Sequence, residues 1–142
     1  TGVAFGNPVF RLGCRLGQAI PIDPERAATS SLAIGAAVLT RGRNLVWFPE
    51  GERSWDGRLK RFRPGVGMLL HHFGTPVVPV LISGAHEALP RGASFPRFRK
   101  VVAHFGEPLA PPDLQSEGEG EAPHDRIVTA LRRHVRDLGA PE

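Results

Sequence analysis

The spacing of hydrophobic residues predicts three helices, over residues 26–40, 64–73 and 125–139. In the first helix, residues 32, 35, 36 and 39 recur at i, i+3, i+4 and i+7, and in the last, apolar residues recur at i, i+4, i+8 and i+11, so that each set shares one helix face. The middle stretch is almost continuously apolar, and Pro64 suits its start and Gly74 its end, which predicts a buried helix. A weaker helical pattern over residues 3–16 is interrupted by Asn7 and Pro8.

Short apolar runs predict strands over residues 19–22, 44–48, 77–82 and 100–105. The run 77–82 is typical of a central parallel strand because it is rich in β-branched residues, whereas Pro21 places the first run at a sheet edge. The alternation of strands and helices predicts an α/β fold with a mixed, largely parallel sheet flanked by helices. We expect residues 1–142 to form a single domain, in which residues 106–123, rich in Pro, Glu and Gly, are a flexible connection to the C-terminal helix.

Composition indicates a folded globular protein that favours anionic partners. Of 142 residues, 41% are hydrophobic and 23% are charged, and 18 Lys and Arg against 14 Asp and Glu give a net charge of +4. Phosphorylated metabolites, anionic lipid and nucleic acid all fit that charge. Because Cys14 is the single cysteine, an internal disulfide and a cysteine-rich zinc site are excluded. No stretch approaches the roughly 18 apolar residues of a membrane-spanning helix.

Candidate chemistry is concentrated where the apolar run 44–48 ends in a polar turn. Glu50, Gly51 and Arg53 follow that run closely, and ligands of open α/β sheets bind at such strand ends. Arg53 offers a planar fork suited to phosphate, and Gly51 lets backbone N–H groups approach a ligand. Glu50 is able to orient Arg53 or to accept a hydrogen bond from a substrate hydroxyl. The turn therefore predicts an anion site, although a plain surface ion pair between Glu50 and Arg53 explains the same pattern.

The same turn resembles the motif of a known family. Phe48-Pro49-Glu50-Gly51-Glu52-Arg53-Ser54 is similar to the Phe-Pro-Glu-Gly-Thr-Arg-Ser signature of the glycerolipid acyltransferases, which include 1-acylglycerol-3-phosphate acyltransferase. Residues 17–23 and 77–82 resemble the second and fourth motifs of that family, in the same order. The resemblance spans about residues 10–110. It implies that substrate is bound by Pro21, Ile22, Asp23, Arg26, Phe48, Pro49, Glu50, Gly51, Glu52, Arg53, Ser54, Val78 and Pro79.

This resemblance implies an O-acyltransferase of phospholipid biosynthesis or remodelling. A fatty acyl group would pass from acyl-CoA or acyl-carrier protein to a hydroxyl of glycerol 3-phosphate, lysophosphatidic acid or another lysophospholipid. No metal and no redox cofactor are implied. We expect a cytoplasmic protein that binds peripherally at the inner face of the membrane.

The family's catalytic base is absent from residues 1–142. In the family, a His-x-x-x-x-Asp motif takes the proton of the acceptor hydroxyl, and none of the 6 histidines here has an aspartate five positions later. That motif precedes the second motif in the family, so we expect it upstream of Thr1 and expect this chain to be N-terminally incomplete and inactive alone. The alternative is a non-catalytic relative that kept a lipid- or phosphate-binding pocket.

Three residues depart from the family pattern or from the usual structural preferences. Glu52 replaces the usual Thr, and its negative charge repels phosphate unless it pairs with Arg53 or Lys60. Arg26 lies further beyond Asp23 than the family's arginine does, because Pro24 and Glu25 intervene. Pro79 is unfavourable within a central strand and indicates a bend at the site.

A basic run over residues 53–63 has two interpretations. It is either a solvated loop or a surface for anionic headgroups or the phosphates of coenzyme A. Nucleic acid is disfavoured, because the sequence contains no recognisable motif of a nucleic-acid-binding module. His71 and His72 indicate helix surface rather than a metal site.

Overall fold

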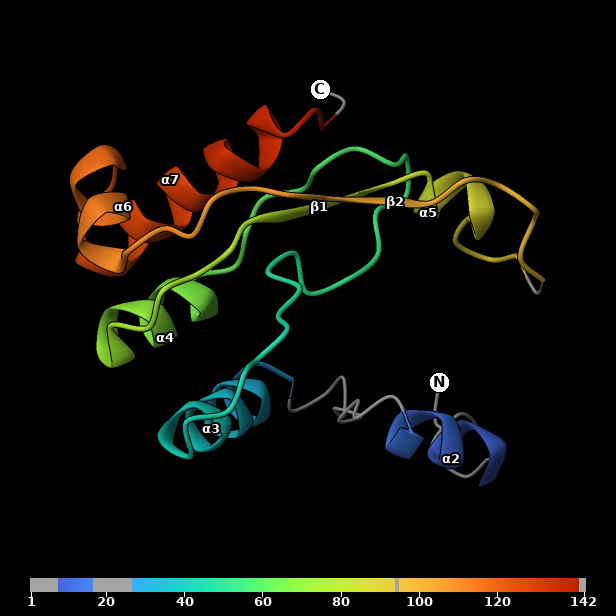
Figure 1. Cartoon of the computed structure of the whole chain (residues 1–142), viewed down its shortest axis with the longest axis horizontal. Coiled ribbons are helices and arrows are strands. Elements are labelled where there is room, and N and C mark those ends of the chain that lie inside the picture. Colours follow the sequence, from blue (N-terminus) through green and yellow to red (C-terminus); the bar gives the residue numbers. More distant parts are fainter. Residues whose placement is uncertain (1–7, 17–26, 94, 141–142) are drawn as a thin grey trace. The chain divides into compact units, whose positions relative to one another are not determined.

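The computed structural model describes residues 8–16, 27–93 and 95–140 (Figure 1). The sequence predicted one domain over residues 1–142, whereas the chain divides into two compact units, residues 1–43 and residues 44–142. None of the described helices is long and apolar enough to cross a bilayer.

The first unit contains two described helices, α2 (Pro8–Leu16) and α3 (Ala27–Thr40). Helix α3 confirms the helix predicted over residues 26–40. Its end is closed by the Thr40 hydroxyl, which donates to the carbonyl of Ala36 at 2.8 Å, and by Gly42, whose φ of 63° turns the chain away. The predicted strand over residues 19–22 lies outside the described residues.

The second unit contains α4 (Gly65–Phe73), β1 (Val80–Ser83), α5 (Ala85–Ala88), β2 (Val102–Phe105), α6 (Pro111–Glu117) and α7 (Pro123–Asp137). Helices α4 and α7 confirm the two remaining predicted helices. Pro64 immediately precedes α4, and Gly74 ends it with φ 61° while its N–H donates to the carbonyl of Leu70. The sequence signals at both ends of α4 were therefore sufficient to locate it.

The core of this unit lies where α7 packs against α4 and α6. Leu114 of α6 and Ile127 of α7 are fully buried. At Gly67 of α4, an added Cβ would collide with the backbone carbonyl of His124, so glycine permits α4 and α7 to approach closely. Figure 1 shows these three helices gathered at one end of the unit, from which the β1–β2 ribbon runs towards α5. The buried cluster consists of Phe62, Val66, Leu70, Leu81, Leu114, Ile127, Ala130, Leu131 and Val135.

The α/β class fits the structure, but the described sheet is not parallel. Its two strands, β1 and β2, pair antiparallel, with Val80 opposite Phe105 and Ser83 opposite Val102. Residues 84–101 connect them through the short helix α5 and return the chain beside the strand that it left. The prediction of a central parallel strand over residues 77–82 was wrong in this respect, because β1 is exposed at Val80 and Ile82 rather than covered on both faces.

The stretch 44–48, predicted as a strand, has no regular secondary structure and pairs with no described strand. Burial alternates along it, since Trp47 packs against the core while Val46 and Phe48 are exposed. The stretch 106–123, expected to be flexible, contains α6. Proline begins this helix at Pro111, and Leu114 inserts into the core, which a compositional argument does not detect.

Candidate functional site

The Phe48–Ser54 motif forms a tight loop that is held against residues 60–63. The N–H of Gly51 donates to the carbonyl of Phe48 at 3.1 Å, and the N–H of Arg63 donates to the carbonyl of Pro49 at 2.8 Å. Gly51 has φ 73°, and an added Cβ there would lie 2.5 Å from Nε of Arg63. Glycine is therefore favoured by its backbone angle, and a side chain at this position would also have to displace the flexible end of Arg63.

Glu50 fastens this loop to the following segment. Its Oε2 accepts a hydrogen bond from the backbone N–H of Lys60 at 2.9 Å, and the residue is half-buried. Arg63 Nε donates to the backbone carbonyl of Glu50 at 3.4 Å. The carboxylate thus organises the loop rather than pairing with Arg53, which argues against the plain Glu50–Arg53 ion pair.

Glu52 is neutralised by two basic side chains. Lys60 Nζ lies 2.6 Å from its Oε1, and Arg91 Nη1 lies 3.0 Å from its Oε2. The hydrogen bond from Lys60, followed by that from Arg91, lowers the pKa of Glu52 to about 2. Lys60 was one of the two partners that the sequence allowed for Glu52, the other being Arg53. Since both carboxylate oxygens are engaged, the repulsion expected between Glu52 and a bound anion is offset.

Arg91 is a site residue that sequence reasoning missed. Its guanidinium carbon lies 3.8 Å from the centre of the Trp55 ring, and Nη1 also donates to the backbone carbonyl of Arg53 at 3.4 Å. These contacts bring a residue nearly forty positions along the chain into the signature loop. No local pattern announces it, because Arg91 lies in a Pro- and Gly-containing loop with no motif of its own.

Arg53 presents the free cation of the loop. Its side chain is exposed, and its guanidinium has no hydrogen bond or ion pair within the part of the chain that the structure describes. The next residue, Ser54, donates from its hydroxyl to Asp56 Oδ1 at 2.9 Å. A backbone hydrogen bond from Arg58, together with the Ser54 hydroxyl, lowers the pKa of Asp56. Arg53 is therefore available to an anion while its neighbours are engaged with one another.

Helix α7 ties the loop to the core. Arg132 donates from Nε to the carbonyl of Lys60 at 3.0 Å and from Nη2 to the carbonyl of Leu59 at 3.1 Å. Its bidentate fork fixes the backbone that in turn holds Glu50 through the N–H of Lys60. A core helix thus determines where the candidate anion site lies.

The other residues assigned by resemblance are not brought to this loop by any described contact. Pro79 is buried and packs against Gly106, whose N–H donates to the Pro79 carbonyl at 2.9 Å. It lies between the isolated Val77–Leu109 bridge and β1, a break in the ladder that accommodates a residue without an N–H. Val78 is exposed. Pro21, Ile22, Asp23 and Arg26 lie outside the described residues.

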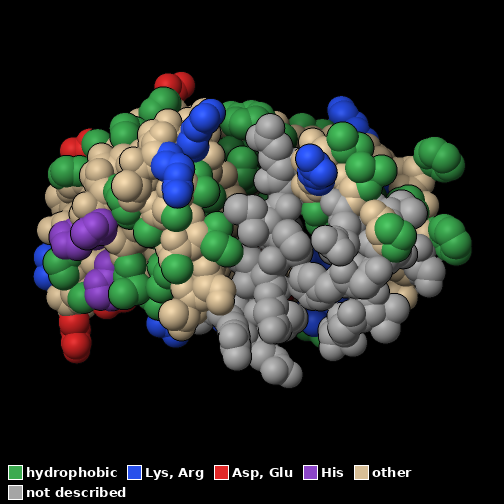
Figure 2. All heavy atoms as spheres, turned by 90° about the horizontal axis from the view of Figure 1, so that it is seen from below, with side chains coloured by type: hydrophobic (Ala, Val, Ile, Leu, Met, Phe, Trp, Pro, Cys, Tyr) green, Lys and Arg blue, Asp and Glu red, His purple; other side chains and the backbone are tan. Residues whose placement is uncertain are grey.

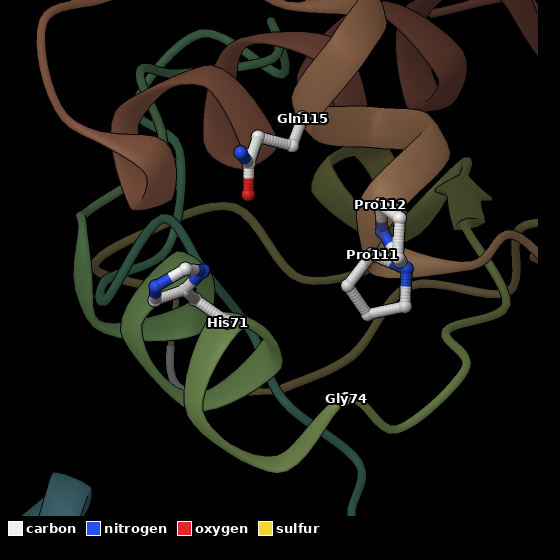
Figure 3. A pocket seen from close by; sticks show the side chains of 5 residues that line it. All are labelled: His71, Gly74, Pro111, Pro112 and Gln115. Atoms are coloured by element: carbon white, nitrogen blue, oxygen red, sulfur yellow. The ribbon is translucent and has the colours of Figure 1, made fainter.

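An open hollow of about 300 Å³ lies elsewhere, between the end of α4 and the start of α6. Figure 3 shows His71 and Gly74 on one side of it and Pro111, Pro112 and Gln115 on the other. None of these residues belongs to the predicted site. His71 and His72 are exposed on α4, as the sequence interpretation of helix surface expected.

Replacing Glu52 by glutamine is expected to lower the thermal unfolding temperature slightly at neutral pH. The folded-state pKa of about 2 lies below the ordinary glutamate pKa of 4.5, so the charged carboxylate contributes stability above pH 4.5 that is lost as the pH falls towards 2. The effect is small because the group is exposed. Thermal unfolding of wild type and E52Q across this range should give curves that converge at acid pH. A matched control is E107Q, whose carboxylate has no described partner, and a pH-independent difference for E52Q would contradict the assignment.

Comparison with known proteins identifies the family. The family model described as Acyltransferase matches residues 3–83, more than half of the chain. The 1-acyl-sn-glycerol-3-phosphate acyltransferase of Limnanthes alba is 33% identical over 118 residues, which are 80% of this chain and 42% of that protein. The chloroplastic enzyme of the same name from Brassica napus is 32% identical over 96 residues, 66% of this chain and 27% of that protein.

A solved structure supports the same relationship. The crystal structure of the 1-acyl-sn-glycerophosphate acyltransferase PlsC from Thermotoga maritima superimposes with a TM-score of 0.55 and 29% identity, covering 78% of this chain and 45% of that one. The chain therefore spans less than half the length of each of these relatives. By its sequence and its fold, the chain belongs to the acyltransferase family, among the glycerolipid acyltransferases similar to 1-acylglycerol-3-phosphate acyltransferase.

Proposed function

We propose that the protein transfers a fatty acyl group to 1-acylglycerol 3-phosphate, and that Arg53 binds the phosphate of this acceptor. The observation that carries the proposal is the exposed Arg53 guanidinium, which has no partner among the described residues. A guanidinium presents paired N–H donors that match two phosphate oxygens. The names of the relatives, which act on an acylglycerol phosphate, support this choice of acceptor.

The surroundings of Arg53 favour a phosphate over a neutral ligand. Lys60 and Arg91 neutralise Glu52, the nearest acidic neighbour in sequence. Arg61 and Arg63 add positive charge close by in the chain. Since Glu50, Gly51 and Arg63 fix the loop before any ligand binds, little ordering entropy opposes binding.

The proposed reaction joins the acceptor hydroxyl oxygen to the acyl carbon of a thioester donor, acyl-CoA or acyl-carrier protein. The carbon–sulfur bond breaks, and the hydroxyl proton is removed by a base and ends on the thiol that leaves. A positioned acceptor phosphate would hold the hydroxyl near the thioester, which lowers the entropic part of the barrier. In this proposal Arg53 positions the acceptor and does not transfer a proton.

A second candidate is a binding domain that holds lipid phosphate without transferring an acyl group. The observation that favours it is that no histidine in residues 1–142 is followed five positions later by an aspartate. The family resemblance implies that such a His–Asp pair supplies the catalytic base. In this reading Arg53 keeps the same phosphate-binding role, and only the chemistry is absent.

The product of the complete gene should be assayed for acyl transfer from radiolabelled acyl-CoA and acyl-carrier protein. The acceptors are glycerol 3-phosphate, lysophosphatidic acid, lysophosphatidylcholine and monoacylglycerol. We expect transfer to lysophosphatidic acid and none to monoacylglycerol, which lacks the phosphate. A folded product that binds lysophosphatidic acid but transfers to no acceptor would replace the enzyme by the binding domain, and efficient transfer to monoacylglycerol would contradict the phosphate site.

A further inference from the structure

The loop that joins α5 to β2, residues 89–101, exposes two aromatic rings. The exposed fraction of Phe95 is 82%, and Phe98 is fully exposed. Leu89 and Val101 at the two ends of the loop are also exposed. Figure 2 shows hydrophobic side chains projecting from the end of the unit that carries α5 in Figure 1, with Lys and Arg side chains nearby. Apolar side chains gathered on one loop indicate a surface that binds a partner.

The charge of this loop defines the chemistry of that partner. Arg97, Arg99 and Lys100 alternate with the aromatic residues, and residues 89–101 contain no Asp or Glu. Within the described chain, the side chains of these three cations have no hydrogen bond or ion pair. Apolar rings beside unpaired cations match the boundary between anionic headgroups and acyl chains of a bilayer.

Backbone hydrogen bonds anchor the described residues on either side of residue 94 in this loop. The N–H of Arg97 donates to the carbonyl of Ala88 at 2.7 Å, and the N–H of Ala93 donates to the carbonyl of Pro90 at 3.0 Å. Arg91, within the same loop, is bonded to Glu52 and stacked on Trp55. The exposed rings are therefore connected through Arg91 to the signature loop that carries Arg53.

We propose that the described parts of this loop, residues 89–93 and 95–101, dock on an anionic lipid bilayer, with Phe95 and Phe98 inserted among the headgroups and Arg97, Arg99 and Lys100 on the lipid phosphates. A bilayer fits better than nucleic acid because the same loop also exposes the aliphatic side chains of Leu89 and Val101, which base stacking does not use. The contact through Arg91 would then hold the anion site beside the membrane. This last consequence rests on the proposed function, whereas the docking itself does not.

Flotation of the 142-residue chain with vesicles tests the docking. Vesicles of phosphatidylcholine with phosphatidylglycerol should bind the chain, and vesicles of phosphatidylcholine alone should bind it less. The double variant F95S/F98S should bind more weakly by about tenfold for each ring removed. The variant R97Q/R99Q/K100Q should lose about fivefold for each charge, on anionic vesicles and at low salt.

Phe105→Ser is the matched control, because Phe105 is also largely exposed but lies outside the loop, at the opposite end of β2. It should bind vesicles like the wild type. Failure of the chain to bind anionic vesicles, unchanged binding of F95S/F98S, or an equal loss in F105S would overturn the proposal. Self-association or binding of single-stranded nucleic acid that F95S/F98S abolishes, without vesicle binding, would assign the loop to that partner instead.

Membrane docking and the proposed acyl transfer can be tested independently of each other. In the complete gene product, F95S/F98S should keep transfer to a short-chain lysophosphatidate dissolved below its micelle-forming concentration and lose transfer to the same lipid presented in vesicles. Arg53→Ala should show the opposite pattern. It should float with vesicles like the wild type but lose transfer to the soluble acceptor. Loss of transfer to the soluble acceptor in F95S/F98S would contradict docking as the role of the rings.

Discussion

Arg53→Ala is expected to weaken binding of a phosphorylated acceptor by roughly 10- to 100-fold, the usual effect of removing hydrogen bonds to a charged group. The reason is that the Arg53 guanidinium is exposed and unpaired among the described residues, whereas Lys60 and Arg91 are already engaged with Glu52. They cannot replace Arg53 without releasing that carboxylate. Titration of the chain with glycerol 3-phosphate, followed by calorimetry, measures the loss.

Two variants separate this role from general electrostatics. Arg58→Ala removes the same charge from the basic run 53–63, but Arg58 lies beside Asp56, 3.9 Å away, and should change the affinity little. Arg53→Lys keeps the charge without the planar fork and should fall between the wild type and Arg53→Ala. Equal losses in Arg53→Ala and Arg58→Ala would mean that the anion responds only to the overall field of the basic run, and the site would then be abandoned.

Ile127→Ala is expected to lower the free energy of unfolding by about 2–5 kcal/mol. Ile127 is fully buried on α7, among residues of α4 and α6, so truncation leaves a cavity that two other helices line. Ile127→Val, which removes one methylene, should cost only about 0.5–1.5 kcal/mol. Urea unfolding of the three proteins measures the series, and a loss below about 0.5 kcal/mol for Ile127→Ala would contradict the packing of α7.

Ile127→Ala also tests whether the core positions the candidate anion site. Arg132 of α7 holds the carbonyls of Leu59 and Lys60, which position the backbone donor to Glu50. At temperatures where Ile127→Ala has unfolded and Ile127→Val has not, phosphate binding should be lost only in the former. Binding that survives the unfolding of α7 would show that the loop is independent of the core.

Local signals in the sequence predicted the helices well. Apolar periodicity, Pro64 and Gly74 act over a few residues, and each is sufficient to define a helix face or a helix end. Helices α3, α4 and α7 accordingly lie within a few residues of their predicted bounds. The prediction succeeded where the structure depends on neighbours in the chain.

Strand pairing was harder to predict because it depends on contacts between distant residues. The run 77–82 reads as a buried strand, yet in the structure part of it pairs antiparallel with residues 102–105 and leaves Val80 and Ile82 exposed. The Pro- and Glu-rich stretch before α7 was misleading for a related reason. One apolar residue, Leu114, reaches the core from it, and composition averages over that residue.

Only some residues of the candidate site could be predicted from the sequence. Gly51, Arg53 and the pairing of Glu52 with Lys60 follow from residue chemistry at short range. Arg91 and Arg132 could not be predicted, because one arrives from the loop after α5 and the other from α7. Both residues hold the loop from distant parts of the chain, and the sequence of the loop itself contains no sign of them.

The most direct test of the account is a nuclear magnetic resonance titration that follows the arginine Nε–Hε resonances of the 142-residue chain. Glycerol 3-phosphate is added in one series and glycerol in the other, with Arg53→Lys used to assign the Arg53 signal. We predict a saturable shift of the Arg53 resonance with glycerol 3-phosphate, a smaller response from Arg58, and none with glycerol. An Arg53 resonance that does not move while the phosphate binds elsewhere, or that moves equally with glycerol, would contradict the phosphate-binding role of Arg53.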